Sequence, residues 1–90
     1  MKSVPALMRQ HCSAEWPDDF QMQDYCLKQQ VEGMAQFKAA SESVGRPLDR
    51  ALERCVSEWT KAGVPNWQMI GYCSKQQAES YRKLHPPERG

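Results

Sequence analysis

The sequence predicts an all-α fold in which two tandem, related helical hairpins form a four-helix domain. Three observations lead to this prediction: a repeated sequence unit, turn residues between the expected helices, and the lack of sustained apolar-polar alternation with β-branched residues. The chain has 90 residues, of which 40% are hydrophobic and 26% are charged. These values suit one domain, residues 1–90, with a single modest core.

The repeat is clearest in DYCLKQQVE (24–32) and GYCSKQQAE (71–79), which share Tyr-Cys-x-Lys-Gln-Gln-x-Glu. A shift of 47 residues superimposes these segments, and a shift of 43 superimposes the preceding Cys-x-x-Glu-Trp segments. The four-residue difference falls between the two parts, in WPDDF against WTKAGVPNW. Because insertions are tolerated in turns and not in packed helices, each unit is expected to be helix, turn, helix. The units are expected to cover about 4–42 and about 47–84.

Turn and capping residues place the ends of the individual helices. Asp19 and Asn66 are good N-caps, and Gly63 favours the end of the helix before it. Pro47 suits the first turn of a new helix, and the prolines at 86 and 87 end the last one. We therefore expect helices at about 4–16, 19–42, 47–62 and 66–84, and no sheet.

The four cysteines are expected to face each other in pairs, Cys12 with Cys26 and Cys55 with Cys73. At a rise of about 1.5 Å per residue, Cys55 and Cys73 lie about 12 and about 10 Å from their turn, and Cys12 and Cys26 lie about 6 and about 10 Å from theirs, an offset that a helix tilt could absorb. Facing Cα atoms of packed helices would be about 4 to 5.5 Å apart, within or close to disulfide range. Two disulfides within the hairpins are the preferred interpretation. The alternative is four free, buried thiols.

Metal, redox and enzymatic functions find little support in the sequence. The cysteines are separated by 13, 28 and 17 residues, whereas structural zinc sites use short Cys-x2–4-Cys knuckles. His11, adjacent to Cys12, is the one residue that hints at an activated thiol, although neighbours in a helix point about 100° apart. We find no Gly-rich phosphate loop, no His-Glu-x-x-His motif and no nucleophile with an evident base. The expectation is a protein that is not an enzyme and has no cofactor, with cysteine-based redox or metal binding as one alternative.

The paired glutamines of the repeat, Gln29-Gln30 and Gln76-Gln77, lie three and four positions after a cysteine that is expected to face inward. Their expected role is structural, as partly buried amides that bridge polar groups across the hairpin. A role in recognition is the alternative.

Charge and hydropathy restrict the classes of partner. The net charge is +1, and acidic residues accompany nearly every basic one, which does not favour a phosphate-binding surface. No apolar run approaches the roughly 18 residues of a membrane span, and the start of the sequence does not resemble a signal peptide. A cytoplasmic location without membrane binding is expected, although four cysteines would suit a secreted chain.

The unit CSAEWPDDFQMQDYCLKQQVE resembles a cysteine-bearing helical repeat of small bacterial and phage proteins. The resemblance covers about 12–32 and 55–79 and implies no catalytic residues. It implies that the chain is a phage or mobile-element inhibitor of a host defence or regulatory complex, in the manner of anti-CRISPR proteins. The hairpin is also similar to that of mitochondrial twin Cys-x9-Cys proteins, but those spacings are absent.

The leading functional prediction is a protein-binding module that has no catalytic activity. Because the repeated residues are needed for the hairpins, the binding surface is sought where the two copies differ. A weak nucleic-acid binder that uses Arg46, Arg50, Arg54 and the Arg82-Lys83 run is the alternative from another class. The predicted partner-binding residues are Asp18, Asp19 and Asp24 near the first turn, and Arg46, Arg50 and Arg54 in and just before the third helix.

Overall fold

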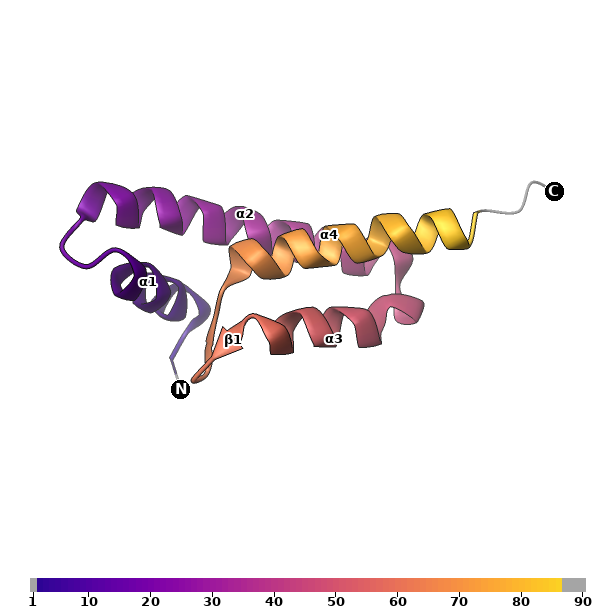
Figure 1. Cartoon of the computed structure of the whole chain (residues 1–90), viewed down its shortest axis with the longest axis horizontal. Helices are drawn as coiled ribbons and strands as arrows, with labels where there is room; N and C mark the ends of the chain where they lie inside the picture. The colour runs from indigo at the N-terminus through magenta and orange to yellow at the C-terminus, as the bar shows by residue number, and fades with distance from the viewer. Residues whose placement is uncertain (1, 87–90) are drawn as a thin grey trace.

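The computed structural model describes residues 2–86, and it confirms the all-α class (Figure 1). The chain forms four α-helices, one turn of 3-10 helix and a two-stranded ladder of two residues per strand. The elements are α1 (Val4–Glu15), α2 (Phe20–Val44), η1 (Arg46–Leu48), α3 (Asp49–Glu58), β1 (Thr60–Lys61), β2 (Val64–Pro65) and α4 (Trp67–Leu84).

Side-chain caps fix the starts of three helices. The Ser3 hydroxyl accepts a hydrogen bond from the amide of Ala6, and Asp19 Oδ1 accepts one from Met22 at 3.1 Å. Asn66 Oδ1 accepts a longer bond, 3.4 Å, from the amide of Met69. Each cap satisfies an amide that has no partner within the first turn of its helix. The predicted N-caps Asp19 and Asn66 are therefore confirmed.

The third helix is shorter than predicted, and the expectation of no sheet is wrong at one place. Instead of continuing to residue 62, α3 ends at Glu58, and β1 and β2 pair antiparallel through Thr60 with Pro65 and Lys61 with Val64. The two residues between the strands, Ala62 and Gly63, both have positive φ (51° and 77°). Positive φ at both central residues is the geometry of the hairpin turn whose twist matches that of the strands. Gly63 therefore lies in the turn of a β-hairpin and does not follow the end of a helix directly.

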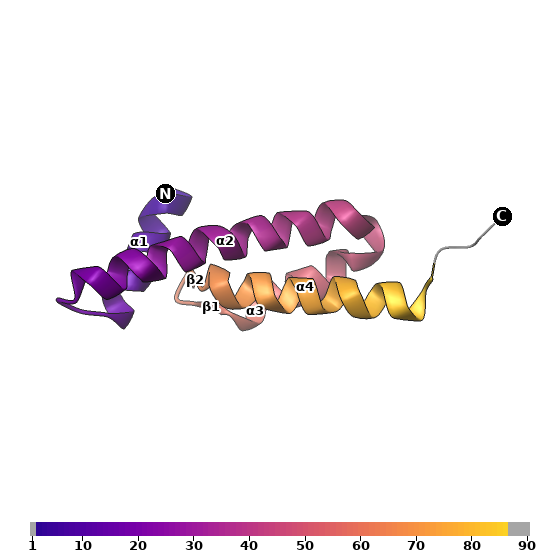
Figure 2. The same cartoon turned by 90° about the horizontal axis from the view of Figure 1, so that it is seen from above.

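One disulfide joins the two helices of each repeat unit, in the pairing that the sequence predicts. Cys12 of α1 is bonded to Cys26 of α2 with a Cα–Cα distance of 5.7 Å. Cys55 of α3 is bonded to Cys73 of α4 with a Cα–Cα distance of 5.8 Å. Figure 2 shows that α1 crosses α2 at a steep angle, so the covalent bond joins two helices that share only a short contact.

The most extensive packing in the molecule is between α2 and α4, which belong to different repeat units. The two helices run in the same direction, with α3 antiparallel to both (Figures 1 and 2). They meet at Gly33 and Gly71, whose backbones touch. A methyl group on Gly33 would overlap the carbonyl of Trp67, and one on Gly71 would overlap the backbone of Gly33. Only glycine permits this approach.

The two repeat units are staggered along the axis of α2. Gly33 and Gly71, which touch, are 38 residues apart, as are Ala40 and Ala78 of the core, whereas equivalent residues of the repeat are 47 apart. The second unit is therefore displaced by nine residues, about 13.5 Å at the helical rise. The predicted disulfide pairing is thus present, but the arrangement as two packed hairpins is not confirmed, because the packing that holds the units together is this staggered α2–α4 contact.

The stagger gives the repeated glutamines different environments. Gln30 is 1% exposed, and its amide bridges to the other hairpin: Oε1 accepts from the amide of Trp67 at 2.6 Å, and Nε2 donates to Asn66 Oδ1 at 3.0 Å. Its counterpart Gln77 is exposed, as is Gln76, because nine residues of displacement leave no helix start beside them. The structural role expected for the glutamine pairs holds for Gln30, across the units and not within its own hairpin, and it is wrong for Gln76 and Gln77.

A small apolar core lies where α2, α3 and α4 come together. Ala40, Leu48, Leu52 and Ala78 are buried there, and four partly buried side chains pack against them: Phe37, Val44, Ala51 and Tyr81. Phe37 also makes an edge-to-face contact with Trp67, with ring centroids 5.5 Å apart. The buried residues that α2 and α4 contribute to this core are the alanines Ala40 and Ala78, in agreement with the close approach of the two helices.

Replacing Gly33 with alanine tests the backbone contact between α2 and α4. Alanine has the better helix propensity by about 1 kcal/mol, so without the contact Gly33→Ala would stabilise the protein. We expect the free energy of unfolding to fall instead, by about 1–3 kcal/mol, because the overlap with the Trp67 backbone requires the helices to separate. Denaturant unfolding of the oxidised protein measures the change. Ala35→Leu on the exposed face of α2 is the control and should change stability by less than about 0.5 kcal/mol. A Gly33→Ala protein as stable as the parent would contradict the contact.

Gln30 and Gln77 form a matched pair for testing the amide bridge. Gln30→Met removes the acceptor of the Trp67 amide and should lower the free energy of unfolding by about 1–3 kcal/mol. Gln77→Met makes the identical change at the exposed counterpart and should have almost no effect. Hydrogen exchange of the Trp67 amide should be faster in the first variant only. Equal effects of the two substitutions would show that the bridge does not contribute to stability.

Candidate functional site

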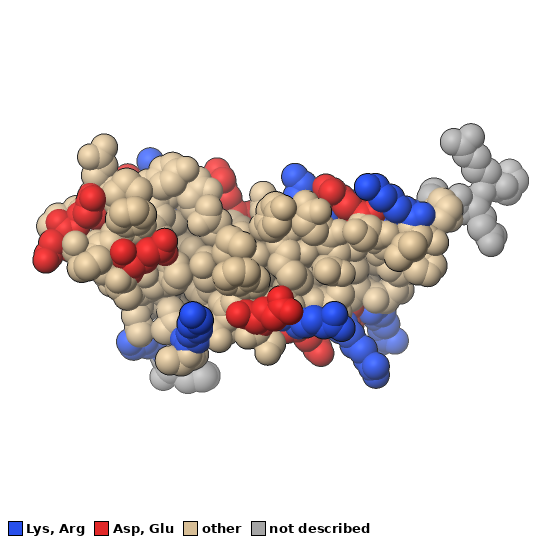
Figure 3. All heavy atoms as spheres, viewed as in Figure 1, with Lys and Arg blue, Asp and Glu red and all other residues tan. Residues whose placement is uncertain are grey.

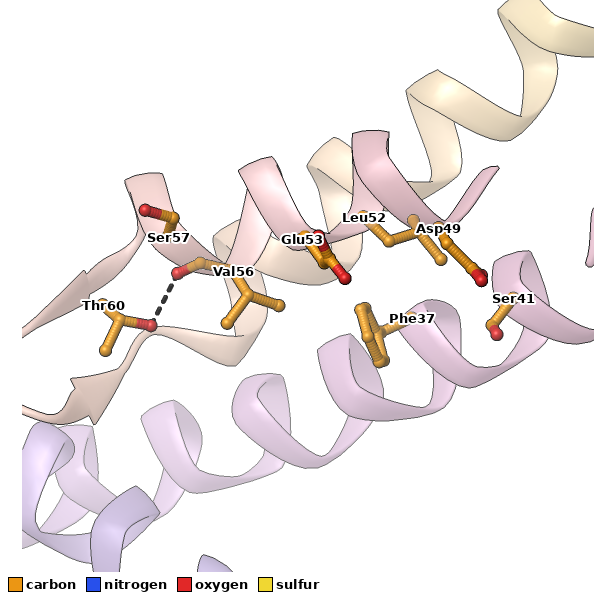
Figure 4. Close-up of a pocket in the computed structure, with 8 residues that line it drawn as sticks. All are labelled: Phe37, Ser41, Asp49, Leu52, Glu53, Val56, Ser57 and Thr60. Carbon is orange, nitrogen blue, oxygen red and sulfur yellow. Dashed lines mark hydrogen bonds between the residues drawn. The ribbon is translucent and has the colours of Figure 1, made fainter. Parts of the chain in front are cut away.

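A groove of about 560 Å³ lies between the second half of α2 and the length of α3. Figure 4 shows Phe37 of α2 directed toward Leu52 and Val56 of α3, so these three side chains form an apolar floor. Polar side chains line its edges: Ser41, Asp49, Glu53, Ser57 and Thr60. The Thr60 hydroxyl is already used, since it donates to the Val56 carbonyl at 2.6 Å.

The edge formed by α3 is acidic. Asp49 and Glu53 are exposed and lie one helical turn apart, about 6 Å along the axis. Within residues 2–86, neither carboxylate is within ion-pair distance of a cation. An apolar floor beside two unpaired carboxylates can accommodate apolar side chains and, next to them, two positive charges.

None of the three predicted arginines lines the groove. Arg46, Arg50 and Arg54 are all exposed and spaced by four residues, so they form a row along η1 and α3. Leu52 and Cys55, which are buried, mark the opposite face of the helix. Figure 3 shows acidic and basic atoms side by side along the edge of the molecule that α3 forms. The row is therefore part of a mixed-charge surface.

The three predicted acidic residues lie at the start of α2. Asp19 caps α2 through its bond to Met22, and Asp24 pairs with Lys28 at 3.5 Å. Asp18 occupies the turn with φ of 61°. All three are exposed, and Figure 3 shows acidic atoms gathered at this end of the molecule. Asp19 therefore has a local structural role, and Asp24 has a nearby ion-pair partner on its own helix.

The structure does not bring the two predicted clusters together. The turn before α2 lies at one end of the molecule, whereas α3 runs along the other half (Figure 1). The groove beside α3 was missed in the sequence, although α3 differs between the copies as expected for a binding surface. The sequence feature that could have indicated the groove is the apolar Val56, one helical turn after Leu52. In the structure Leu52 is buried, whereas Val56 is only partly covered.

A second groove, of about 570 Å³, lies between α1 and α2 beside the first disulfide. Its lining carries both signs of charge, with Lys2 and Arg9 from the α1 end and Asp24 from α2. Lys2 also reaches across to the side-chain oxygen of Gln10, at 2.5 Å. Because its charges are mixed and its lysine is already hydrogen-bonded, this groove shows no preference for a partner of one charge.

One group of side chains in the described part of the chain has the spacing of metal ligands. Donor atoms of His11, Glu15 and Cys26 all lie within 4.8 Å of one another. Cys26 is bonded to Cys12 in this structure, so its sulfur is not available as a thiolate.

Comparisons with models of protein families, with curated protein sequences and with solved structures gave no match to this chain. A search of the helices in residues 2–86 found none that combines the length and the apolar character needed to cross a bilayer.

Proposed function

We propose that the protein is a binding module without catalytic activity and that the groove between α2 and α3 holds an amphipathic helix of a partner protein. The observation that carries the proposal is the combination of an apolar floor, Phe37, Leu52 and Val56, with the unpaired carboxylates of Asp49 and Glu53. Helix-in-groove binding uses apolar anchors at helical spacing on one face of the guest helix.

The spacing of the carboxylates defines the chemistry of the guest. Asp49 and Glu53 are four residues apart on a helix, so two basic side chains four residues apart on the guest helix can face them. Apolar side chains next to this basic pair would lie on Phe37 and Val56. Acidic grooves attract such partners from a distance and select their orientation, while the apolar contacts supply most of the affinity.

The rigidity of the groove favours binding. Its two walls are connected through the shared contacts of α2 and α3 with α4 and through the Cys55–Cys73 disulfide. A partner therefore meets a surface that is already formed, and little conformational entropy is lost on binding.

Nucleic acid is the less favoured partner. The Arg46, Arg50 and Arg54 row is accompanied on the same helix by Asp49, Glu53 and Glu58. Phosphate-binding surfaces concentrate basic residues and avoid acidic ones. The row therefore provides a control surface on the side of α3 opposite the buried Leu52 and Cys55.

The probe for this proposal is a synthetic 14-residue helical peptide with one apolar face and two lysines four residues apart beside it. We expect it to bind and to shift the backbone NMR signals of Phe37, Leu52 and Val56 more than those of α1. Asp49→Lys/Glu53→Lys should weaken binding by roughly 10-fold or more, because attraction becomes repulsion. Val56→Glu should weaken it similarly by placing a charge on the apolar floor.

Three controls separate this outcome from general charge effects. Glu32→Lys/Glu42→Lys makes the same change of net charge at exposed sites outside the groove and should bind as the parent does. A peptide of the same composition with a scrambled order should not bind. Arg50→Glu/Arg54→Glu should leave peptide binding unchanged or slightly tighter. If the groove variants bind the peptide as well as the parent, the proposal is wrong. Salt-sensitive binding of a nucleic-acid duplex that is lost with the arginine variant would favour the other class of partner.

A further inference from the structure

The end of the molecule near the first disulfide holds potential metal ligands in addition to the two bonded cysteines. His11 and Glu15 are four residues apart on α1, the spacing that places two ligands on one face of a helix. Cys12 follows His11 directly, and Cys26 comes to this place from α2. The donor atoms of His11, Glu15 and Cys26 lie within 4.8 Å of one another.

His11 presents a nitrogen that the protein leaves without a hydrogen bond. Its Nε2 is buried, and Glu15 Oε2 lies 2.9 Å away, but the two atoms are not aligned for a hydrogen bond. Buried polar atoms without a partner are rare, and a ligand explains one when other donors surround it. Here a carboxylate and a cysteine sulfur do so.

The site is sheltered, yet open to small solutes. Cys12 and Cys26 are 1% and 7% exposed, whereas the side chains of His11 and Glu15 are 18% and 50% exposed. His11 also lines a cavity of about 420 Å³ beside the β1–β2 turn, together with Trp59 and Asn66. A metal ion could enter past Glu15 and be held against the buried sulfurs.

We propose that reduction of the Cys12–Cys26 disulfide converts this end of the molecule into a binding site for zinc or a similar borderline-soft cation. The ligands are the thiolates of Cys12 and Cys26, Nε2 of His11 and a carboxylate oxygen of Glu15. Two sulfurs, one nitrogen and one oxygen suit tetrahedral Zn²⁺. The metal joins α1 to α2 in place of the covalent bond.

The chemistry of the conversion balances with a dithiol as the reductant. The dithiol supplies two electrons and two protons, the Cys12–Cys26 bond breaks, two cysteine thiols form, and the dithiol becomes a disulfide. Metal binding then releases the two thiol protons to solvent. The sulfurs must move from bonding distance to about 3.8 Å apart, the separation given by two Zn–S bonds of about 2.3 Å at a tetrahedral angle.

The second disulfide provides an internal comparison. In the repeat, the positions of His11 and Glu15 correspond to Arg54 and Glu58. Arginine stays charged and is not a metal ligand in proteins, so the second pair of cysteines lacks the nitrogen donor. Among residues 2–86, the group at the first disulfide is the one with the spacing of metal donors. The donor set thus belongs to one copy of a repeat whose cysteines are common to both.

The test uses Co²⁺ as a spectroscopic substitute for Zn²⁺, because thiolate ligation to tetrahedral Co²⁺ produces characteristic absorption. Full-length Cys55→Ser/Cys73→Ser protein keeps the proposed site and removes competing thiols. After reduction with a phosphine, we expect one Co²⁺ per chain with thiolate absorption, displaced by Zn²⁺, and no binding in the oxidised protein. Cys12→Ser/Cys26→Ser, which keeps only the second pair, should not give this signal.

Two substitutions test the other ligands. His11→Arg introduces the residue that the second repeat has at this position and should weaken Co²⁺ binding by roughly 100-fold. Glu15→Gln should weaken it less, and Glu32→Gln, at an exposed position on α2, should have no effect. A reduced parent that shows no thiolate-to-cobalt absorption would overturn the proposal, and so would equal affinity in His11→Arg.

A folding readout covers the case in which reduction loosens α1. Circular dichroism of the reduced protein should then show a loss of helix content, and Zn²⁺ should restore it because metal binding and folding are coupled. The restoration should be absent in His11→Arg. If Zn²⁺ restores helix content equally in both proteins, or in neither, the site does not exist. The outcome is independent of peptide binding to the groove between α2 and α3.

Discussion

The direct contact between the backbones of α2 and α4 determines how the other elements are arranged. Because Gly33 and Gly71 lack side chains, the two helices approach until backbone atoms touch. That approach brings Gln30 to the start of α4, where its amide bonds to Trp67 and Asn66, and it brings Ala40 against Ala78 in the core. The contact also sets the level at which α3 lies along α2. The groove between these two helices is therefore a consequence of a glycine crossing in which α3 takes no part.

The disulfides have a different role from this crossing. Each closes a short loop, with sequence separations of 14 and 18 between the bonded cysteines, and each contributes roughly 3 kcal/mol in the chain-entropy estimate. The buried apolar side chains are few and mostly small, so this contribution is large relative to a typical stability of 5–15 kcal/mol. For α1, which lies outside the core that α2, α3 and α4 form, the first disulfide adds a covalent connection to its packing against α2 and β2.

Much of the local structure can be predicted from the sequence, because it depends on interactions over a few residues. The cysteine pairing follows from the helical rise and the position of the turns, and Asp19 and Asn66 are caps by their chemistry. The stagger cannot be predicted in this way, since two glycines in different helices leave no periodic pattern that would pair them. The hairpin at 60–65 was missed because its central residues are Ala62 and Gly63 and not the usual Asn-Gly. Gln30 and Gln77 occupy the same position of the repeat, so the repeat pattern does not separate them, whereas tertiary packing does. The candidate groove was missed for the same reason: its floor combines Phe37 with Val56, and its existence depends on where α3 lies.

The stagger of the two hairpins also gives the molecule a direction. A twofold axis would exchange the two copies, so the same surface would be present twice. A displacement along one axis moves the first copy onto the second but does not move the second onto the first. A repeated residue can consequently differ in environment between the two copies, as the buried Gln30 and the exposed Gln77 do. The two ends of the molecule therefore differ, and a partner that recognises either end can bind in one orientation only.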